Sequence, residues 1–159
     1  MSASPHYSKT EIERRWLIPS DSEFDRVSGR ERRIEDRYVL GTRLRLRKVT
    51  EAGHATVYKL GKKYEPEVEG THQVVSIYLS ESEYEALAHL PARVARKRRL
   101  SVYGGSLDVY EHPNTGLRVF EVEFATPEQA AAYAPPRGVG DEITNEPRYS
   151  GHAVAAGAA

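Results

Sequence analysis

The first patterned stretch of the chain, residues 11–18, alternates between charged and apolar side chains. The charged residues stand at odd positions and the apolar ones at even positions: Glu11, Glu13 and Arg15 against Ile12, Trp16 and Ile18. Because successive side chains of a β-strand point to opposite faces, a strand here has one charged and one apolar face. The apolar face is expected to pack on a core, so the charged face is the one that requires explanation.

Three later segments repeat this two-faced alternation. Their charged positions are Arg43, Arg45 and Arg47 in "TRLRLRK", Asp108 in "SLDVYE", and Glu121 and Glu123 in "VFEVEF". One solvated, charged face is ordinary for an antiparallel sheet, and a structural role with such a face remains an alternative. Four strands whose charges are sorted by sign instead favour a sheet that closes with its charged faces inward.

The remaining pattern predicts one α+β domain over residues 1–159. Strands are expected at 11–18, 33–41, 42–49, 53–63, 72–79, 93–103, 106–111 and 117–124, with a last short strand within 141–149. Helix-start signals predict short helices within 20–29, 80–91 and 126–136. We therefore expect an eight-stranded antiparallel β-barrel with a charged interior, a few flanking helices, a core of about 11–150, and loose termini at 1–9 and 151–159.

Charge is separated along the chain although the net charge is zero, with 23 basic and 23 acidic residues. Residues 37–63 hold eight basic residues and one acid, and five of the seven residues 93–99 are basic. Acids gather instead in the strands at 11–18 and 117–124. This separation indicates a site with a basic and an acidic half.

Composition also excludes several classes of protein and several kinds of site. The absence of cysteine excludes disulfides, thiolate metal sites and cysteine nucleophiles. No apolar run approaches the length of a membrane span, and the N-terminus lacks a signal-peptide core, so we expect a cytoplasmic protein without a membrane partner. The basic run "ARKRRL" has no interleaved aromatics, which argues against dedicated nucleic-acid binding. The sequence leaves the oligomeric state open, a homodimer included.

The two charged halves suggest a particular chemistry. Arginines at alternate positions present parallel donors suited to successive phosphate groups, and Lys59, Lys97 and Arg99 add positive charge. Carboxylates from two strands supply the oxygen ligands that suit Mg²⁺ or Mn²⁺. A basic face and an acidic face around a metal would hold a triphosphate and favour phosphoryl transfer to water.

Seven motifs in order resemble the CYTH superfamily, the triphosphate tunnel metalloenzymes. They are "EIERR", "RLRLR", "VYKL", "KRRL", "LDVY", "EVEF" and "DEITNEPRY", which together span roughly residues 11–150. The chain is most similar to short bacterial single-domain members. The resemblance implies an eight-stranded tunnel, a divalent cation and a small-molecule triphosphate or polyphosphate substrate.

The resemblance also assigns roles to residues. It implies catalytic roles for Glu11, Glu13 and Arg15; substrate binding by Arg43, Arg45, Arg47, Lys59, Lys97 and Arg99; and metal binding by Glu11, Glu13, Asp108, Glu121 and Glu123, with Glu142 as an added acid. The chain departs from the family pattern twice. Arg15 replaces the lysine of the first motif, and the inward positions expected in 72–79 carry no acid: His72, Val74, Ser76 and Tyr78.

These observations lead to a functional hypothesis with two rivals. The first hypothesis is a metal-dependent hydrolase of a triphosphate, foremost inorganic tripolyphosphate, which releases orthophosphate. The first rival is a lyase of the adenylate cyclase type acting on ATP. The second is a non-catalytic module that binds polyphosphate or a nucleotide, which the missing acid in 72–79 favours.

Overall fold

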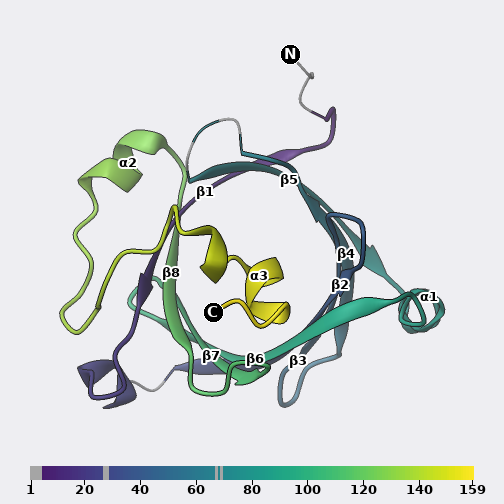
Figure 1. The fold of residues 1–159 in the computed structure, drawn as a ribbon, viewed down its shortest axis with the longest axis horizontal. Coiled ribbons are helices and arrows are strands. Elements are labelled where there is room, and N and C mark those ends of the chain that lie inside the picture. Colours follow the sequence, from purple (N-terminus) through teal and green to yellow (C-terminus); the bar gives the residue numbers. More distant parts are fainter. Residues whose placement is uncertain (1–4, 27–28, 67, 69) are drawn as a thin grey trace.

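Eight antiparallel strands close into a barrel in the computed structural model, which describes residues 5–26, 29–66, 68 and 70–159 (Figure 1). The strands are β1 (Lys9–Leu17), β2 (Arg30–Val39), β3 (Leu44–Thr50), β4 (Val57–Lys63), β5 (Thr71–Leu79), β6 (Ala92–Val102), β7 (Gly105–His112) and β8 (Arg118–Phe124). Their order around the barrel is β1-β5-β4-β3-β2-β6-β7-β8, and β8 pairs again with β1. The predicted α+β barrel is confirmed.

Two of the helices begin where the capping signals predict. In α1 (Glu81–Leu87), the Ser80 hydroxyl accepts a hydrogen bond from the Glu83 backbone N–H, and the Glu83 side chain accepts one from the Ser80 N–H. In α2 (Pro127–Ala132), Thr126 caps the first turn. Each cap satisfies backbone donors that lack a partner within the helix. Over the described residues, no helix has the length and apolar character needed to cross a bilayer.

Two other predicted elements are shorter than expected. The helix predicted within 20–29 is a 3₁₀ helix at Glu23–Arg26 in the described part of that range. The last strand predicted within 141–149 is reduced to one bridge between Trp16 and Glu142, followed by a 3₁₀ helix at Pro147–Tyr149. Pro147 lacks the N–H that a continued strand ladder would use.

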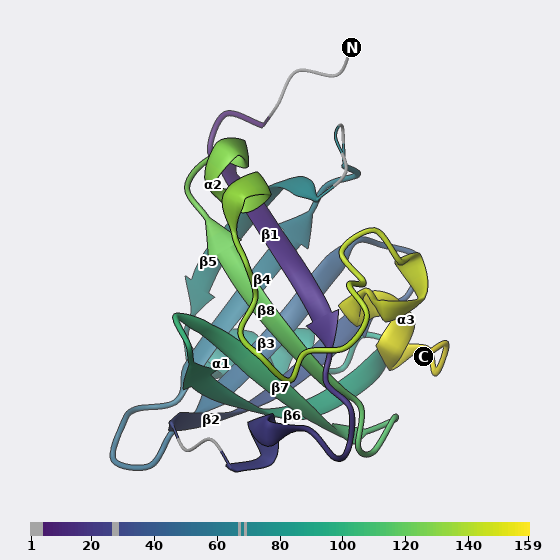
Figure 2. The same cartoon turned by 90° about the vertical axis from the view of Figure 1, so that its left-hand side faces the viewer.

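One hydrophobic core lies outside the barrel wall. Trp16 of β1 and Phe120 of β8 point outward and pack with Phe24, which is 1% exposed. Helix α2 covers the same side of the barrel, where Tyr133 contacts Trp16 (Figure 2). The apolar face of the 11–18 pattern therefore packs on a core, as predicted, and its charged face is left for the interior.

The C-terminal residues differ from the loose segment expected over 151–159. Helix α3 (Gly151–Ala155) lies across one end of the barrel, in both views (Figures 1 and 2). Val154 is fully buried and packs in a cluster with Tyr110 and Ala95 from the barrel wall. A Cβ on Gly151 would stand 2.1 Å from the Tyr38 hydroxyl, so any other residue here would require the Tyr38 side chain to move. Small apolar residues thus seal this end.

Candidate functional site

The strand register decides which side chains face the barrel interior. Directly opposed residues of paired strands point to the same face of the sheet. The inner face can therefore be followed from strand to strand around the whole barrel. Asp36 opposes Arg47, Arg47 opposes Lys59, and Arg15 opposes Glu121. The sequence-predicted residues that register places on the inner face are Glu11, Glu13, Arg15, Arg45, Arg47, Lys59, Lys97, Arg99, Asp108, Glu121 and Glu123.

The basic wall on β3 is organised by an acid from β2. Arg47 donates two hydrogen bonds of 2.7 Å to Asp36, whose carboxylate is also 3.8 Å from the Arg45 Nε. Burial favours the neutral acid, but Arg47 and Arg45 outweigh it and hold the pKa of Asp36 well below its usual range. Asp36 is therefore an ionised, buried group that fixes the direction of Arg47.

A second acid organises the cations of β6. Asp108 accepts hydrogen bonds from Lys97 at 2.7 Å and from Arg99 at 2.6 and 2.8 Å. Despite full burial, Lys97 and Arg99 lower the pKa of Asp108 below its usual range. The metal-binding role that the resemblance implied for Asp108 stays a prediction. Both carboxylate oxygens are already bound by cations, so the residue orients Lys97 and Arg99.

The acidic half is centred on β1 and contains a lysine. The Lys63 ammonium lies 2.7 Å from a Glu11 oxygen and 3.1 Å from a Glu13 oxygen. Burial and the neighbouring Glu121 raise the pKa of Glu13 to about 7. Glu11 behaves in the opposite way, because Lys63 outweighs its burial and lowers its pKa. Two carboxylates thus share one cation, and a third carboxylate stands close to Glu13.

Glu121 and Glu123 of β8 occupy different depths. Glu121 lies in the interior, 3.4 Å from the Arg15 Nε and 3.8 Å from an Arg99 nitrogen. Glu123 opposes Glu13 in the register, but its side chain is 55% exposed and lies 3.8 Å from Lys9 at the start of β1. Glu121 therefore joins the acidic and basic halves, and Glu123 stands near an opening.

Several interior cations have donors without a hydrogen-bond partner, or lack an acid partner altogether. Buried Nε atoms of Arg15, Arg32 and Arg45 have no hydrogen-bond partner. Arg32 faces Arg99 across β2 and β6, and burial together with Arg99 lowers its pKa. Among the described residues, no carboxylate pairs with Arg32 or Lys59; Lys59 lies over the Tyr78 ring instead. Buried donors without partners are costly, so this wall is suited to an added anion.

The donors of the acidic half fit a hard divalent cation, although they are not preassembled around one. Within residues 5–26, 29–66, 68 and 70–159, no three His, Asp or Glu side chains are grouped to hold a metal ion. However, the Lys63 ammonium marks a point between Glu11 and Glu13 where a cation is already stabilised. Carboxylate oxygens are also the ligands that Mg²⁺ and Mn²⁺ prefer.

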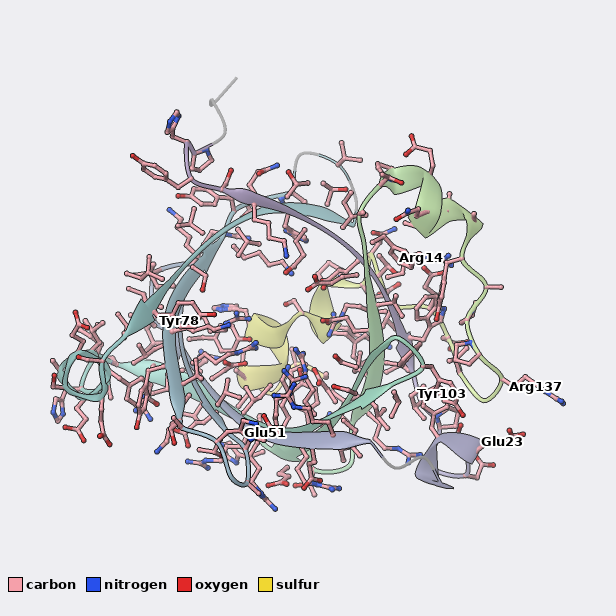
Figure 3. The ribbon with its side chains drawn as sticks, turned by 180° about the vertical axis from the view of Figure 1, so that it is seen from behind. Arg14, Glu23, Glu51, Tyr78, Tyr103 and Arg137 are labelled. Carbon is pink, nitrogen blue, oxygen red and sulfur yellow. The ribbon has the colours of Figure 1, made fainter. Side chains whose placement is uncertain are left out.

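Two sequence candidates lie away from this interior cluster. Arg43 is exposed at a strand end, where it pairs with Glu65 and donates to the Lys63 carbonyl. It lines a cavity of about 600 Å³ beside His152 and Lys62, apart from the other candidates. Glu142 pairs with Arg14 at 2.8 Å on the outer face of the barrel (Figure 3). The structure therefore brings neither residue into the interior cluster.

The inner positions of β5 are those expected from the sequence. His72 opposes Glu11, Ser76 opposes Gly61, and Tyr78 opposes Lys59, while Val74 opposes Lys63. None of these residues is acidic. The wall that the resemblance expects to carry an acid is thus neutral here, which leaves the acids of the interior on β1, β2, β7 and β8.

Sequence reasoning missed three interior residues: Asp36, Lys63 and Arg32. A period-two count from Lys59 would have placed Lys63 on the same face, because four residues separate them. No comparable signal existed on β2. Both faces of "RRIEDRY" carry charges, so the contrast between charged and apolar faces that marks the other strands is absent there.

Comparisons with known proteins point to the fold. The chain is similar to two crystal structures of NE1496, one described as a hypothetical protein and one as an inorganic triphosphatase. Each match has 24% sequence identity, covers 91% of this chain and has a TM-score of 0.56. The matches cover 97% and 93% of the two NE1496 chains. The putative adenylyl cyclase HpAC1 from Hippeastrum, described as having a dominant triphosphatase activity, is 15% identical over 76% of this chain and 82% of its own, with a TM-score of 0.46. No protein-family model and no curated protein sequence matches the chain.

Proposed function

We propose that this protein hydrolyses a triphosphate inside the barrel, with inorganic tripolyphosphate as the foremost substrate and orthophosphate as product. The observation that carries the proposal is the set of buried guanidinium Nε atoms without a hydrogen-bond partner on Arg15, Arg32 and Arg45. A linear polyanion supplies many acceptor oxygens to such donors, and hydrogen bonds between ions are among the strongest in proteins. Neutral ligands would leave the surplus positive charge uncompensated.

The shared fold supports the substrate class. The structures of NE1496 include one described as an inorganic triphosphatase, and the match with it covers 91% of this chain. The ordered motifs of residues 11–150 resemble the same group of tunnel enzymes. Neither likeness defines an organic group on the substrate, and a bare tripolyphosphate needs only the charged walls described above.

Each wall has a distinct task in this proposal. The basic wall binds and orients the phosphate chain through Arg32, Arg45, Arg47, Lys59, Lys97 and Arg99. Glu11, Glu13 and Glu121 would hold Mg²⁺ or Mn²⁺, with Glu123 near the opening, and the bound ion would polarise phosphate oxygens. Arg15 lies beside Glu121, where it can stabilise charge that develops on a transferred phosphoryl group.

A second candidate function is binding without turnover. It is favoured by the neutral inner face of β5 and by the lack of three grouped metal ligands among the described residues. Activation of an attacking water usually needs a base or a metal ion. A protein with the basic wall alone would bind polyphosphate or a nucleotide and release nothing.

A product screen separates the candidates. Purified protein is incubated with tripolyphosphate, nucleoside triphosphates and thiamine triphosphate in Mg²⁺, Mn²⁺ or EDTA, and products are resolved by ion chromatography. The proposal expects orthophosphate from tripolyphosphate in a divalent metal and none in EDTA. Pyrophosphate with a cyclic nucleotide would identify a lyase, and calorimetric binding without any product would identify the binding module.

A further inference from the structure

Lys63 occupies the centre of the acidic half. Its ammonium lies 2.7 Å from Glu11 and 3.1 Å from Glu13, and burial is outweighed by these acids, which raise the pKa of Lys63. The lysine is therefore a charged group at ambient pH. It reaches this point from the last residue of β4, where it opposes Val74 of β5.

The position of the ammonium conflicts with that of a divalent cation. Mg²⁺ binds carboxylate oxygens at about 2.0–2.1 Å, and an ion between Glu11 and Glu13 would need the oxygens that Lys63 now uses. Two positive charges about 4 Å apart also repel each other, and partial burial weakens the screening of that repulsion. The Lys63 ammonium and a divalent cation therefore cannot both lie between Glu11 and Glu13.

We propose that Lys63 is an intramolecular competitor of the divalent cation, whose ammonium must leave Glu11 and Glu13 before a metal ion binds between them. The inference rests on the proposed function only for the location of the metal. According to this inference, Lys63 sets the concentration of divalent cation that the protein needs for metal binding. Removal of the ammonium leaves Glu11, Glu13 and the nearby Glu121 mutually repelling, so a divalent cation should then bind more strongly.

Mn²⁺ binding to the substrate-free protein tests the competition directly. Free Mn²⁺ is followed by electron paramagnetic resonance for the wild type and for Lys63→Met, Lys63→Gln and Lys62→Met. Lys62 is the matched control, since it is adjacent on β4, points to the other face and lies over the Tyr64 ring. We expect Mn²⁺ to bind at least tenfold more tightly to both Lys63 variants and within twofold of the wild type in Lys62→Met.

Equal Mn²⁺ affinity in the wild type and the folded Lys63 variants would overturn the proposal. If a Lys63 variant unfolds in EDTA, its refolding on Mn²⁺ addition, seen by circular dichroism, supports the proposal, and failure to refold counts against it. Phosphate release is measured in parallel. Tighter Mn²⁺ binding without release in any protein would refute the proposed hydrolysis and leave the competition standing. Release by the wild type with unchanged affinity in the Lys63 variants would refute only the competition.

Discussion

Asp36 holds Arg47 through two parallel hydrogen bonds of 2.7 Å in the interior of the barrel, where the Asp36 side chain is 2% exposed. The pair fixes the guanidinium of Arg47 with a geometry that a lysine would not reproduce. The Nε of Arg45 lies 3.8 Å from the same carboxylate and has no hydrogen-bond partner. One acid therefore orients one arginine of the basic wall and leaves the next one available for a ligand.

Asp36→Asn should destabilise the protein strongly at neutral pH. The amide keeps the volume but leaves Arg47 buried without a counter-charge, and breaking such a pair costs about 3–5 kcal/mol. Glu31 lies on β2 like Asp36, and Glu31→Gln, which breaks its exposed pair with Arg98 of β6, should cost no more than about 1 kcal/mol. Urea denaturation at pH 7 measures both. Equal small losses would show that Asp36 does not stabilise Arg47 as described.

The same pair predicts a pH dependence of stability. The pKa of Asp36 is lowered in the folded state, so its contribution is fully present above the unfolded pKa of about 3.9. The contribution is lost as the pH falls below that value toward the lower folded pKa. The difference in unfolding free energy between the wild type and Asp36→Asn should therefore be constant above pH 5 and narrow below about pH 4. A difference that widens in acid would contradict this assignment.

Arg45→Ala should weaken tripolyphosphate binding much more than it weakens folding. A charge-assisted contact contributes about 1.5–3 kcal/mol, so affinity should fall at least tenfold, as measured by calorimetry in EDTA. The melting temperature should change little, because the Arg45 Nε lacks a hydrogen-bond partner. Lys48→Ala, the outward neighbour on β3, should bind like the wild type. A collapsed melting temperature with intact affinity would make Arg45 a structural residue.

The predictable and unpredictable parts of the site differ in their physical origin. The barrel followed from period-two alternation, because strands such as 117–124 have one charged and one apolar face. The contacts of Asp108 with Lys97 and Arg99 did not, since a sequence shows that an acid faces inward but not which cations reach it. Residues 151–159 looked loose because alanine and glycine carry no strong pattern. Their order comes from the barrel end that Val154 fills.

The seal formed by α3 predicts a large effect at Val154. Val154→Asp places a carboxylate in a buried apolar cluster that includes Val119 and Ile143, so the variant should lose at least about 3 kcal/mol of unfolding free energy. Ala156→Asp adds the same charge at an exposed position and serves as the control. Urea denaturation measures the unfolding free energy of both variants. Equal unfolding free energies in Val154→Asp and Ala156→Asp would mean that α3 contributes little to closing the barrel.

Glu121→Gln should separate the two halves of the site. The amide keeps the size of the side chain and removes its charge, so metal-dependent turnover should disappear while binding of tripolyphosphate in EDTA is retained or strengthened. Glu123→Gln should have a weaker effect on turnover, since that side chain is 55% exposed near Lys9. Phosphate release in Mn²⁺ and calorimetry in EDTA measure the two properties. Normal turnover in both variants would remove β8 from the proposed metal site.

Ser76→Glu restores an acid on the neutral wall of β5. Ser76 opposes Gly61, and a Cβ on Gly61 would lie 3.9 Å from an Arg45 nitrogen, so the new carboxylate lies on the inner face close to Arg45. An added oxygen ligand should raise phosphate release in Mn²⁺ above that of the wild type. It should also weaken tripolyphosphate binding in EDTA, because it neutralises part of the charge of Arg45. Val74→Glu, opposite Lys63, should also raise release, since it offers that lysine a partner other than Glu11 and Glu13.

Ile77→Glu is the control for the new acid, because Ile77 directly follows Ser76, lies on the outer face and is 53% exposed. It should leave both release and binding as in the wild type. If Ser76→Glu and Val74→Glu fold and yet release no more phosphate than Ile77→Glu, the neutral wall is not what limits turnover. If the wild type itself releases phosphate, its barrel would then already hold every acid that the reaction needs, and Glu13, with its pKa of about 7, would be the residue to replace next. No release from any of these proteins would instead support binding without turnover.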